Sequence, residues 1–201
     1  MKQGTLLSHL RAPDNETIVV CALPSELPEV LPETVLFTGV GKINASYSLT
    51  RYLSAHPEVR RVINYGTGGG AYKVEMGHLY NCTTFLQGDI DCGELCDGPG
   101  LTFGDDVAVS GVINFGTEGL ICRTQDQFVS DIDGLDMLEH LVNNNKFNIV
   151  DMEAYALAKV CASMNKDFIC YKYISDDASD DASGEWYENC LLYTSDAADE
   201  V

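Results

Sequence analysis

The chain has 201 residues, of which 45% are hydrophobic and 21% are charged, a balance typical of one globular α/β or α+β domain. Its 12 basic residues against 31 acidic residues give a formal net charge of −19, which repels nucleic acid and anionic lipid, so we expect no nucleic-acid partner and no membrane partner. No apolar stretch approaches the roughly 20 residues that cross a bilayer, and the first residues do not read as a secretory signal, so the protein is expected in the cytoplasm.

Short β-branched segments alternate with amphipathic segments along the chain, and this alternation predicts one α/β domain. Several of the apolar runs are continuous, as in strands that are covered on both faces. In chain order the predicted strands are Thr17–Leu23, Val35–Val40, Arg61–Gly66, His78–Phe85, Val107–Asn114, Phe147–Val150 and Phe168–Ile174. The predicted helices are Ala45–Ala55 with Asn44 as N-cap, Leu135–Asn143, and Met152–Met164 with Asp151 in the capping position. The Gly- and Asp-rich stretch 88–104 is predicted to be a long loop.

The C-terminal residues differ in character from the rest of the chain. Residues 190–200 back-translate into an adapter that is used in DNA sequencing libraries, so we expect residues 190–201 to be a non-native tail. The natural domain is then expected to comprise residues 1–189 and to continue in residues that are absent here, which makes the fold C-terminally truncated. The alternative is an ordinary acidic tail.

The sequence gives little indication of a metal site. Cys92 and Cys96 are the only closely spaced cysteines, and no second Cys or His pair follows them, as a zinc site would require. The acidic residues after Ile174 do not have the spacing of a calcium-binding loop. We expect no metal and no organic cofactor.

Four polar or Gly-rich segments follow apolar runs, at the carboxyl ends of predicted strands where open α/β sheets form ligand crevices. They contain Glu26 in a Leu-Pro-Ser-Glu turn, the glycines of 64–70, Glu153 and Asp176. The glycine segment is neither a P-loop nor a dinucleotide fingerprint, and its backbone amides are free to approach a ligand. Two alternatives stay open: Glu26 as a solvated loop acid, and Glu153 as a plain helix-capping acid rather than a ligand for a vicinal diol.

These segments in series resemble the purine nucleoside phosphorylase/nucleosidase superfamily, and most closely its 5′-methylthioadenosine/S-adenosylhomocysteine nucleosidases. The resemblance spans about residues 17–185 and is carried by GVGKINA (39–45), INYGTGGG (63–70), TQDQFV (124–129), VDMEA (150–154) and ISD (174–176). It implies a single-domain, three-layer α/β fold with a central mixed twisted sheet. It also implies a homodimer in which a neighbouring subunit completes the pocket for the 5′ substituent.

The resemblance implies a role for each motif. Asp176 matches the acid that protonates purine N7, Glu26 matches the carboxylate that activates water, and Glu153 matches the residue that binds the 2′- and 3′-hydroxyls of the ribose. The other residues placed at the substrate are Met152 beside the sugar, Phe128 on the base, Val129 at the adenine edge, Val40 in the 5′ pocket, Thr67 near the water, and Gly68, Asp151, Ser175 and Lys172. Thr67 stands where the family usually has Ser, and Lys172 where it usually has Arg.

General chemistry agrees with these roles. Departure of the purine from C1′ leaves a cationic sugar and a negatively charged purine, so an acid at N7 and a carboxylate near the sugar lower the barrier. Phosphorolysis would need Arg or Lys in the cleft, whereas Leu-Pro-Ser-Glu and Asn64 stand where hexameric phosphorylases of this superfamily carry arginine. We expect hydrolysis of the N-ribosidic bond of a small purine nucleoside with release of adenine. A phosphorolytic enzyme and a nucleoside-binding protein without turnover are the alternatives.

Overall fold

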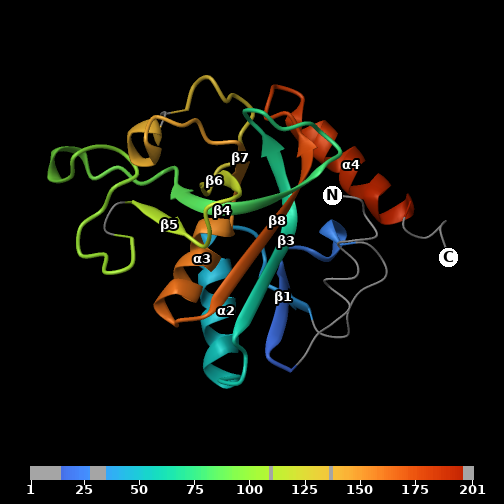
Figure 1. Ribbon diagram of the computed structural model, residues 1–201. Helices are drawn as coiled ribbons and strands as arrows, with labels where there is room; N and C mark the ends of the chain where they lie inside the picture. Colours follow the sequence, from blue (N-terminus) through green and yellow to red (C-terminus); the bar gives the residue numbers. More distant parts are fainter. Residues whose placement is uncertain (1–14, 28–34, 109–110, 136–137, 197–201) are drawn as a thin grey trace.

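The computed structural model describes residues 15–27, 35–108, 111–135 and 138–196, without the side chains of 139, 140 and 190–196. In these ranges the strands are β1 (Thr17–Cys21), β2 (Val35–Phe37), β3 (Arg61–Gly70), β4 (Leu79–Gln87), β5 (Val112–Asn114), β6 (Leu120–Thr124), β7 (Ile149–Asp151) and β8 (Asp167–Asp176) (Figure 1). The α-helices are α2 (Lys42–Ala55), α3 (Ala154–Ser163) and α4 (Ala182–Asp196). Three short 3-10 helices are η1 (Pro24–Glu26), η2 (Gly93–Leu95) and η3 (Leu138–Val142).

All of these strands belong to one mixed sheet that closes on itself in part. β1 pairs in parallel with β2 and β3, and β3 pairs in parallel with β8 along almost its whole length. The end of β3 pairs with β7, β7 pairs with β6, and β6 pairs with β4, which returns to β8. β5 adds to the free side of β4. β3, β7, β6, β4 and β8 therefore form a closed, barrel-like ring, at which the carboxyl ends of β3, β7 and β8 meet.

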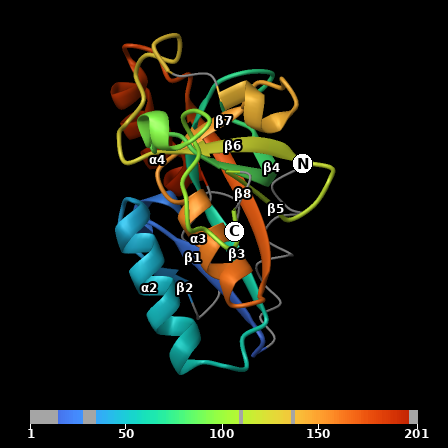
Figure 2. The same cartoon turned by 90° about the vertical axis from the view of Figure 1, so that its left-hand side faces the viewer.

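Helices α2 and α3 lie side by side over one face of the sheet (Figures 1 and 2). The buried residues Leu49 and Leu53 of α2 and Leu157 of α3 pack in the main core with Val62 and other apolar side chains of the strands. Ile63 and Tyr65 point to the opposite face, where they belong to a second core cluster. The long helix α4 contacts β8 and η1. The mixed α/β fold with helices on both sides of a central sheet, as expected from the sequence, is confirmed.

Two helix predictions need correction. The predicted helix 135–143 is wrong, because only Leu138–Val142 is helical and it is a 3-10 turn, while positions 136 and 137 lie outside the described residues. Asn143 and Asn144 follow it with φ of 54° and 62°, a left-handed backbone that ends a right-handed helix. Asn44 is not the N-cap of the first helix. That helix begins at Lys42 after Gly41, whose φ is 95°, and the Asn44 side chain donates to the Val40 carbonyl instead.

Strand ends differ from the predictions for local reasons. β3 continues through the glycines to Gly70 instead of ending at Gly66. The predicted strand 107–114 shrinks to Val112–Asn114, because the Asp105 carboxylate accepts the amides of Val107 and Ala108, and positions 109 and 110 lie outside the described residues. β6 had no counterpart among the predicted strands. Its sequence LICRT is short and ends in polar residues, which hides the strand pattern.

Helix α4 includes the predicted boundary between residues 189 and 190. The side chains of 190–196 and all of 197–201 lie outside the described residues, so the assignment of 190–201 as a separate tail stays a prediction. Within the described ranges, none of the helices combines the length and the apolar character that a membrane span requires.

Candidate active site

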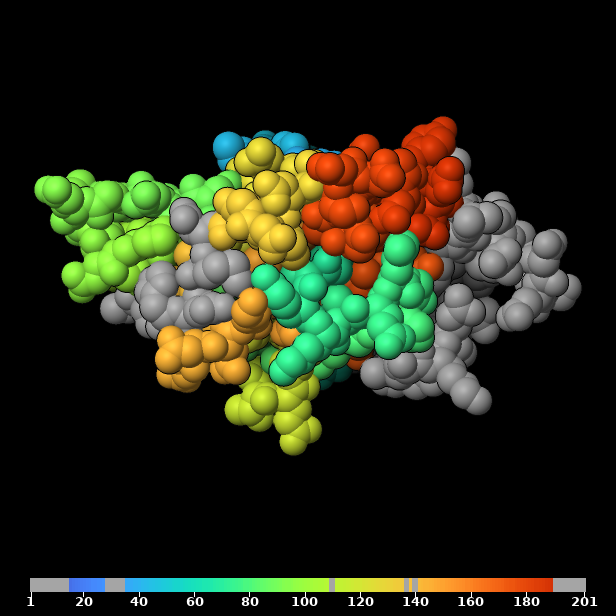
Figure 3. Space-filling view, turned by 90° about the horizontal axis from the view of Figure 1, so that it is seen from above, coloured from blue at the N-terminus to red at the C-terminus, as the bar shows by residue number. Residues whose placement is uncertain are grey.

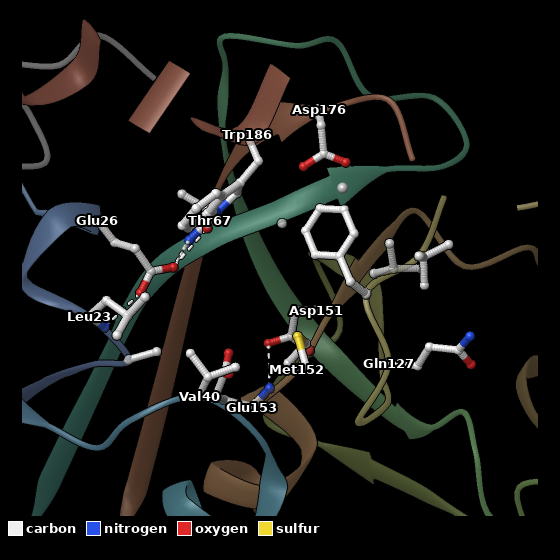
Figure 4. A pocket seen from close by; sticks show the side chains of 16 residues that line it. Leu23, Glu26, Val40, Thr67, Gln127, Asp151, Met152, Glu153, Asp176 and Trp186 are labelled. Carbon is white, nitrogen blue, oxygen red and sulfur yellow. Dashed lines mark hydrogen bonds between the residues drawn. The ribbon is translucent and has the colours of Figure 1, made fainter. Parts of the chain in front are cut away.

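A cavity lies beside η1 and the start of α3, at the carboxyl ends of β1, β3, β7 and β8 (Figure 4). Its empty volume, which includes the open mouth, is about 740 Å³. Seen from above, α4 and the segment after β6 lie next to each other over this end of the molecule (Figure 3). The lining residues are Ala22, Leu23, Glu26, Val40, Thr67, Gly68, Gly69, Gln127, Phe128, Val129, Val150, Asp151, Met152, Glu153, Asp176 and Trp186.

Most residues proposed from the sequence meet at this cavity. Its walls include Glu26, Val40, Thr67, Gly68, Phe128, Val129, Asp151, Met152, Glu153 and Asp176. Two proposed residues, Ser175 and Lys172, are not on the walls. Both are buried directly behind them, where Ser175 contacts Asp176 and Lys172 contacts Asp151. Four sequence segments that are far apart in the chain are thus brought to one place.

Glu26 is held rigidly by donors from both sides. Its Oε1 accepts hydrogen bonds from the Thr67 amide at 3.0 Å and from Thr67 Oγ1 at 2.7 Å. Its Oε2 accepts from the Leu23 amide at 2.9 Å and from Cys21 Sγ at 3.4 Å. Burial and this neighbouring acid raise the pKa of the Cys21 thiol, which therefore stays a neutral donor. Glu26 is only 6% exposed, so the alternative of a solvated loop acid is wrong.

Asp176 ends β8 and lines the same cavity, beside the end of β3 (Figure 4). Its Oδ2 accepts from Ser175 Oγ at 2.8 Å, and its Oδ1 accepts from the Ala178 amide at 3.1 Å. Burial raises the pKa of this carboxyl; the two hydrogen bonds act against that rise, and the charges of Glu185 and Asp177 add to it. An acid with a raised pKa is suited to hold a proton and to donate it.

Asp151 and Lys172 form a buried ion pair behind the floor of the cavity. Lys172 Nζ lies 2.7 Å from Asp151 Oδ2. Thr124 Oγ1 donates to Asp151 Oδ1 at 2.5 Å, and the amides of Glu153 and Ala154 donate to Oδ2 at 3.2 and 2.8 Å. Burial alone would raise the pKa of Asp151, but the Lys172 charge and these hydrogen bonds hold it below its usual value. Asp151 therefore accepts the amide of Ala154, the first residue of α3. The predicted helix start at Met152 with Asp151 as N-cap is wrong, because α3 begins at Ala154 and its N-cap is Glu153.

Glu153 is the N-cap residue of α3, yet its side chain caps nothing in that helix. Instead, its Oε1 accepts a hydrogen bond of 2.8 Å from the amide of Gly41, the residue directly before α2. Burial and the nearby Asp151 charge raise its pKa to about 7. The plain capping alternative is therefore wrong for Glu153, whose carboxyl is directed to the cavity wall.

The glycines after Tyr65 form part of β3, so the expectation of a glycine loop is wrong. Gly68 and Gly69 line the cavity from within the strand. They are required because other groups come very close. A Cβ at Gly68 would lie 2.8 Å from Ile149 Cγ2, and a Cβ at Gly69 would lie 2.8 Å from Asp176 Oδ1. The absence of side chains here lets β7 and Asp176 close against β3.

Sequence reasoning missed Trp186 and Gln127 as wall residues. Trp186 Nε1 donates to Thr67 Oγ1 at 3.0 Å, which ties α4 to the glycine-rich end of β3. The signal for Trp186 was its rarity, because it is the one tryptophan of the chain. Without a predicted helix around it, this residue could not be connected to the site.

The charge of the cavity is distinctive. Among its described wall residues four are acidic and none is Lys or Arg. The nearby Lys172 ammonium is directed to Asp151. In the described part of the chain, no three or more His, Cys, Asp or Glu side chains are grouped so as to hold a metal ion. Such a cavity suits a ligand that develops positive charge rather than an anion.

Comparisons with known proteins give the family. A model of the Phosphorylase superfamily matches residues 27–199. The 5′-methylthioadenosine/S-adenosylhomocysteine nucleosidase of Shewanella sediminis is 28% identical over 169 residues, covering 75% of this chain and 71% of the relative. The protein of the same name from Lysinibacillus sphaericus is 30% identical over 166 residues, covering 74% and 70%.

Solved structures share the fold. The nucleosidase of the same name from S. pneumoniae, with a transition-state inhibitor, superposes with a TM-score of 0.70 at 15% identity over 90% of this chain and 96% of that chain. The native structure of futalosine hydrolase of Helicobacter pylori gives a TM-score of 0.69 at 17% identity over 92% and 99%. By its sequence match and its fold, this chain belongs to the Phosphorylase superfamily.

Proposed function

We propose that this protein is a nucleosidase that hydrolyses the N-ribosidic bond of adenine nucleosides with a 5′-thio substituent, as in 5′-methylthioadenosine and S-adenosylhomocysteine. The observation that carries the proposal is the pair of buried carboxyl groups, Glu26 and Asp176, that line one cavity. Asp176 has the raised pKa of a proton donor. The relatives named above are nucleosidases for these two substrates, which supports the same substrate class here.

In the proposed reaction, Asp176 gives its proton to N7 of the purine as the bond between C1′ and N9 breaks. The electron pair of that bond leaves with adenine, and the sugar becomes a cation at C1′. A water molecule adds to C1′, and Glu26 accepts its proton. The products are adenine and a 5-thioribose, and the proton on Glu26 balances the one lost by Asp176. No metal or organic cofactor enters these steps.

The remaining walls have binding roles in this proposal. Glu153 accepts hydrogen bonds from the 2′- and 3′-hydroxyls, and Met152 packs beside the sugar. Phe128 is 42% exposed at the cavity, which leaves its ring free to stack on the base, and the Val129 backbone reads the adenine edge. Val40 lines the region of the 5′ substituent, and Gly68 keeps the floor open. Ser175 and Lys172 support these groups from behind, through Asp176 and the wall residue Asp151.

Hydrolysis is favoured over phosphorolysis by the charge of the site. Phosphate binding needs Arg or Lys in the cleft, and the described wall residues include neither. The Lys172 ammonium beneath the floor is engaged by Asp151 at 2.7 Å. The Glu26 carboxylate would repel a phosphate ion and stabilise a cationic sugar, whereas Asp176 is neutral as the acid and Asp151 is paired with Lys172.

The test is to follow adenine release from 5′-methylthioadenosine by the purified protein, with and without phosphate, for the wild type and for Asp176→Asn. We expect release that does not depend on phosphate and that falls by roughly 100-fold or more in Asp176→Asn. Release that requires phosphate would make the protein a phosphorylase. Binding of 5′-methylthioadenosine without any release of adenine would make it a nucleoside-binding protein.

We also propose that the protein is a homodimer in which the exposed face of α2 meets a second copy. Ile43 and Tyr47, one turn apart on α2, are 78% and 65% exposed. They border a groove that also contains basic side chains such as Lys42 and acidic ones such as Asp126. A mixed charge pattern beside an apolar centre suits a self-complementary, two-fold contact. Val40 at the cavity mouth continues this surface, so a second copy there would help to cover the 5′ substituent.

Sedimentation equilibrium tests the dimer. Tyr47→Glu is expected to shift the mass from dimer to monomer and to raise KM, because the second copy covers the cavity mouth. Phe103→Glu is the matched control, since Phe103 is 68% exposed and lies outside α2, between η2 and β5. A wild-type monomer, or a dimer that is unaffected by Tyr47→Glu, would refute this interface.

We place the activity in the cytoplasm. The described cysteines are all free, including five that are buried in the structure. Unpaired thiols are the usual state of proteins in reducing compartments. Fractionation of the producing cells, followed by immunodetection, would test this location.

A further inference from the structure

A chain of three hydrogen-bonded residues crosses the cavity wall and ends at the carboxylate proposed to activate water. Trp186 Nε1 lies 3.0 Å from Thr67 Oγ1, and Thr67 Oγ1 lies 2.7 Å from Glu26 Oε1 (Figure 4). All three residues line the same cavity. Trp186 belongs to α4, Thr67 to β3 and Glu26 to η1, so the chain joins three separate elements.

The direction of each hydrogen bond follows from chemistry. An indole N–H can only donate, so Thr67 Oγ1 is the acceptor of the Trp186 bond. The Thr67 hydroxyl has one proton, which is then left for the carboxylate, because an ionised carboxylate can only accept. Trp186 therefore selects one rotor of the Thr67 hydroxyl. Without the indole N–H, that hydroxyl would be free to turn towards other acceptors.

The same oxygen of Glu26 receives a second donor from the same residue. The Thr67 amide lies 3.0 Å from Oε1, so the amide and the hydroxyl of one residue both donate to the same carboxylate oxygen. Because the strand β3 fixes the amide, the hydroxyl is the one of these two donors that can rotate. Its orientation contributes to the orientation of the Glu26 carboxylate, and hence to where that carboxylate meets a water molecule.

We propose that Trp186 is a positioning residue for the hydrolytic step, which acts through the Thr67 hydroxyl on the orientation of Glu26. The inference rests on the proposed function, since it takes Glu26 as the group that accepts the proton of water. It assigns to α4 a role in the chemistry beyond covering the cavity. A wall residue that only contacted substrate would affect binding, whereas a positioning residue affects turnover.

The test is a double-mutant cycle on the full chain with 5′-methylthioadenosine as substrate. Trp186→Phe keeps an aromatic ring and removes the N–H, and Thr67→Val removes the hydroxyl. We expect Trp186→Phe to lower kcat by roughly threefold to tenfold, the usual value of one lost hydrogen bond, while KM changes by less. In the Thr67→Val background, Trp186→Phe is expected to have no further effect on kcat, because the group that transmits its influence is gone.

Two further variants make the test specific. Thr67→Ser keeps the hydroxyl, so in that background Trp186→Phe should again lower kcat. Tyr187→Phe is the control on α4, since Tyr187 is 63% exposed and its kcat and KM should equal those of the wild type. Urea unfolding of each variant shows whether it is folded under assay conditions. Because the chain has a single tryptophan, its fluorescence also reports on the contact without turnover, and Thr67→Val should shift the emission.

The outcomes separate the two proposals. A wild type that releases no adenine would overturn the proposed function and the role of Trp186 with it. An active wild type in which Trp186→Phe and Thr67→Val act independently on kcat would overturn the positioning role alone. If Trp186→Phe changes KM and leaves kcat unchanged, Trp186 only contacts the substrate, and the positioning role is likewise overturned.

Discussion

Lys172 Nζ lies 2.7 Å from Asp151 Oδ2, and the side chains of the two residues are 1% and 0% exposed. The contact joins the middle of β8 to the end of β7, directly before α3 begins. Asp151 also accepts the first amides of α3, so the ion pair, the helix start and the floor of the cavity form one unit. Lys172 places a positive charge beneath a cavity that is otherwise acidic.

Removal of one partner of this pair should destabilise the fold strongly. Lys172→Met or Asp151→Asn is expected to lower the free energy of unfolding by about 3–5 kcal/mol, because the other charge stays buried without its partner. The double variant should recover part of this loss. Urea unfolding measures the difference. The control is the exposed pair Arg61–Asp167, at 3.8 Å, where Arg61→Met should cost less than about 1 kcal/mol.

The pair also sets a pH window for stability. The pKa of Asp151 is lowered in the folded protein, so its contribution is present above the unfolded value of about 3.9 and is lost as the pH falls through the folded pKa. The pKa of Lys172 is raised, so its contribution is present below about 10.4 and is lost as the pH rises through the folded pKa. The effect of Asp151→Asn on unfolding should therefore be largest between these limits. If Asp151→Asn lowers the free energy of unfolding equally at every pH, the stabilising role of this ion pair is contradicted.

Gly69→Ala should lower kcat, because the new side chain displaces Asp176. A Cβ at Gly69 would lie 2.8 Å from Asp176 Oδ1 and 2.9 Å from Val150 Cγ2, so the acid or the strand must move. A displacement of this size lowers kcat by about 100-fold in well-positioned sites. Gly184→Ala is the matched control, because nothing lies within 4 Å of a Cβ there. Wild-type kcat in Gly69→Ala would show that Asp176 tolerates the shift and is not held as proposed.

The sequence was informative where a functional acid directly follows an apolar strand. Asp176 ends β8, and Glu153 follows β7, so pattern alone placed both at the carboxyl edge of the sheet. The burial of Lys172 was also readable in principle. It alternates with Phe168, Cys170 and Ile174, which all belong to the main core. Its partner Asp151 was not, because that requires knowing how β7 and β8 lie in space.

The missed features depend on long-range packing. Trp186 reaches the site only because α4 lies against β8 and η1, and neither periodicity nor capping residues predicted that helix. The sequence predicts a loop at the glycines of β3, because it does not show that Ile149 and Asp176 approach them. The predicted helix 135–143 failed because local propensity does not foresee the left-handed backbone of Asn143.

Glu185→Gln should shift the pH profile of the reaction. Burial raises the pKa of Asp176, and the Glu185 charge adds to that rise, so neutralising Glu185 lowers the pKa. Asp176 must be protonated to act, so activity is lost as the pH rises through this pKa. The basic limb of kcat/KM is therefore expected at lower pH in Glu185→Gln than in the wild type, with a smaller difference at high salt. Glu188→Gln, an exposed neighbour on α4, should leave the limb in place. A shift towards higher pH would contradict the role of Asp176 as the acid.

Glu153 should discriminate nucleosides by their 2′-hydroxyl in a pH-dependent way. Its pKa of about 7 means that it becomes a charged acceptor as the pH rises through neutrality. Because hydrogen bonds to charged groups are the stronger ones, the ratio of kcat/KM for 5′-methylthioadenosine to that for its 2′-deoxy analogue should rise between about pH 6 and about pH 8. Effects of Asp176 and Glu26 are common to both substrates and cancel in this ratio. Glu153→Gln should make the ratio small and independent of pH. A ratio that keeps its pH dependence in Glu153→Gln would assign the sugar contact to another titrating group.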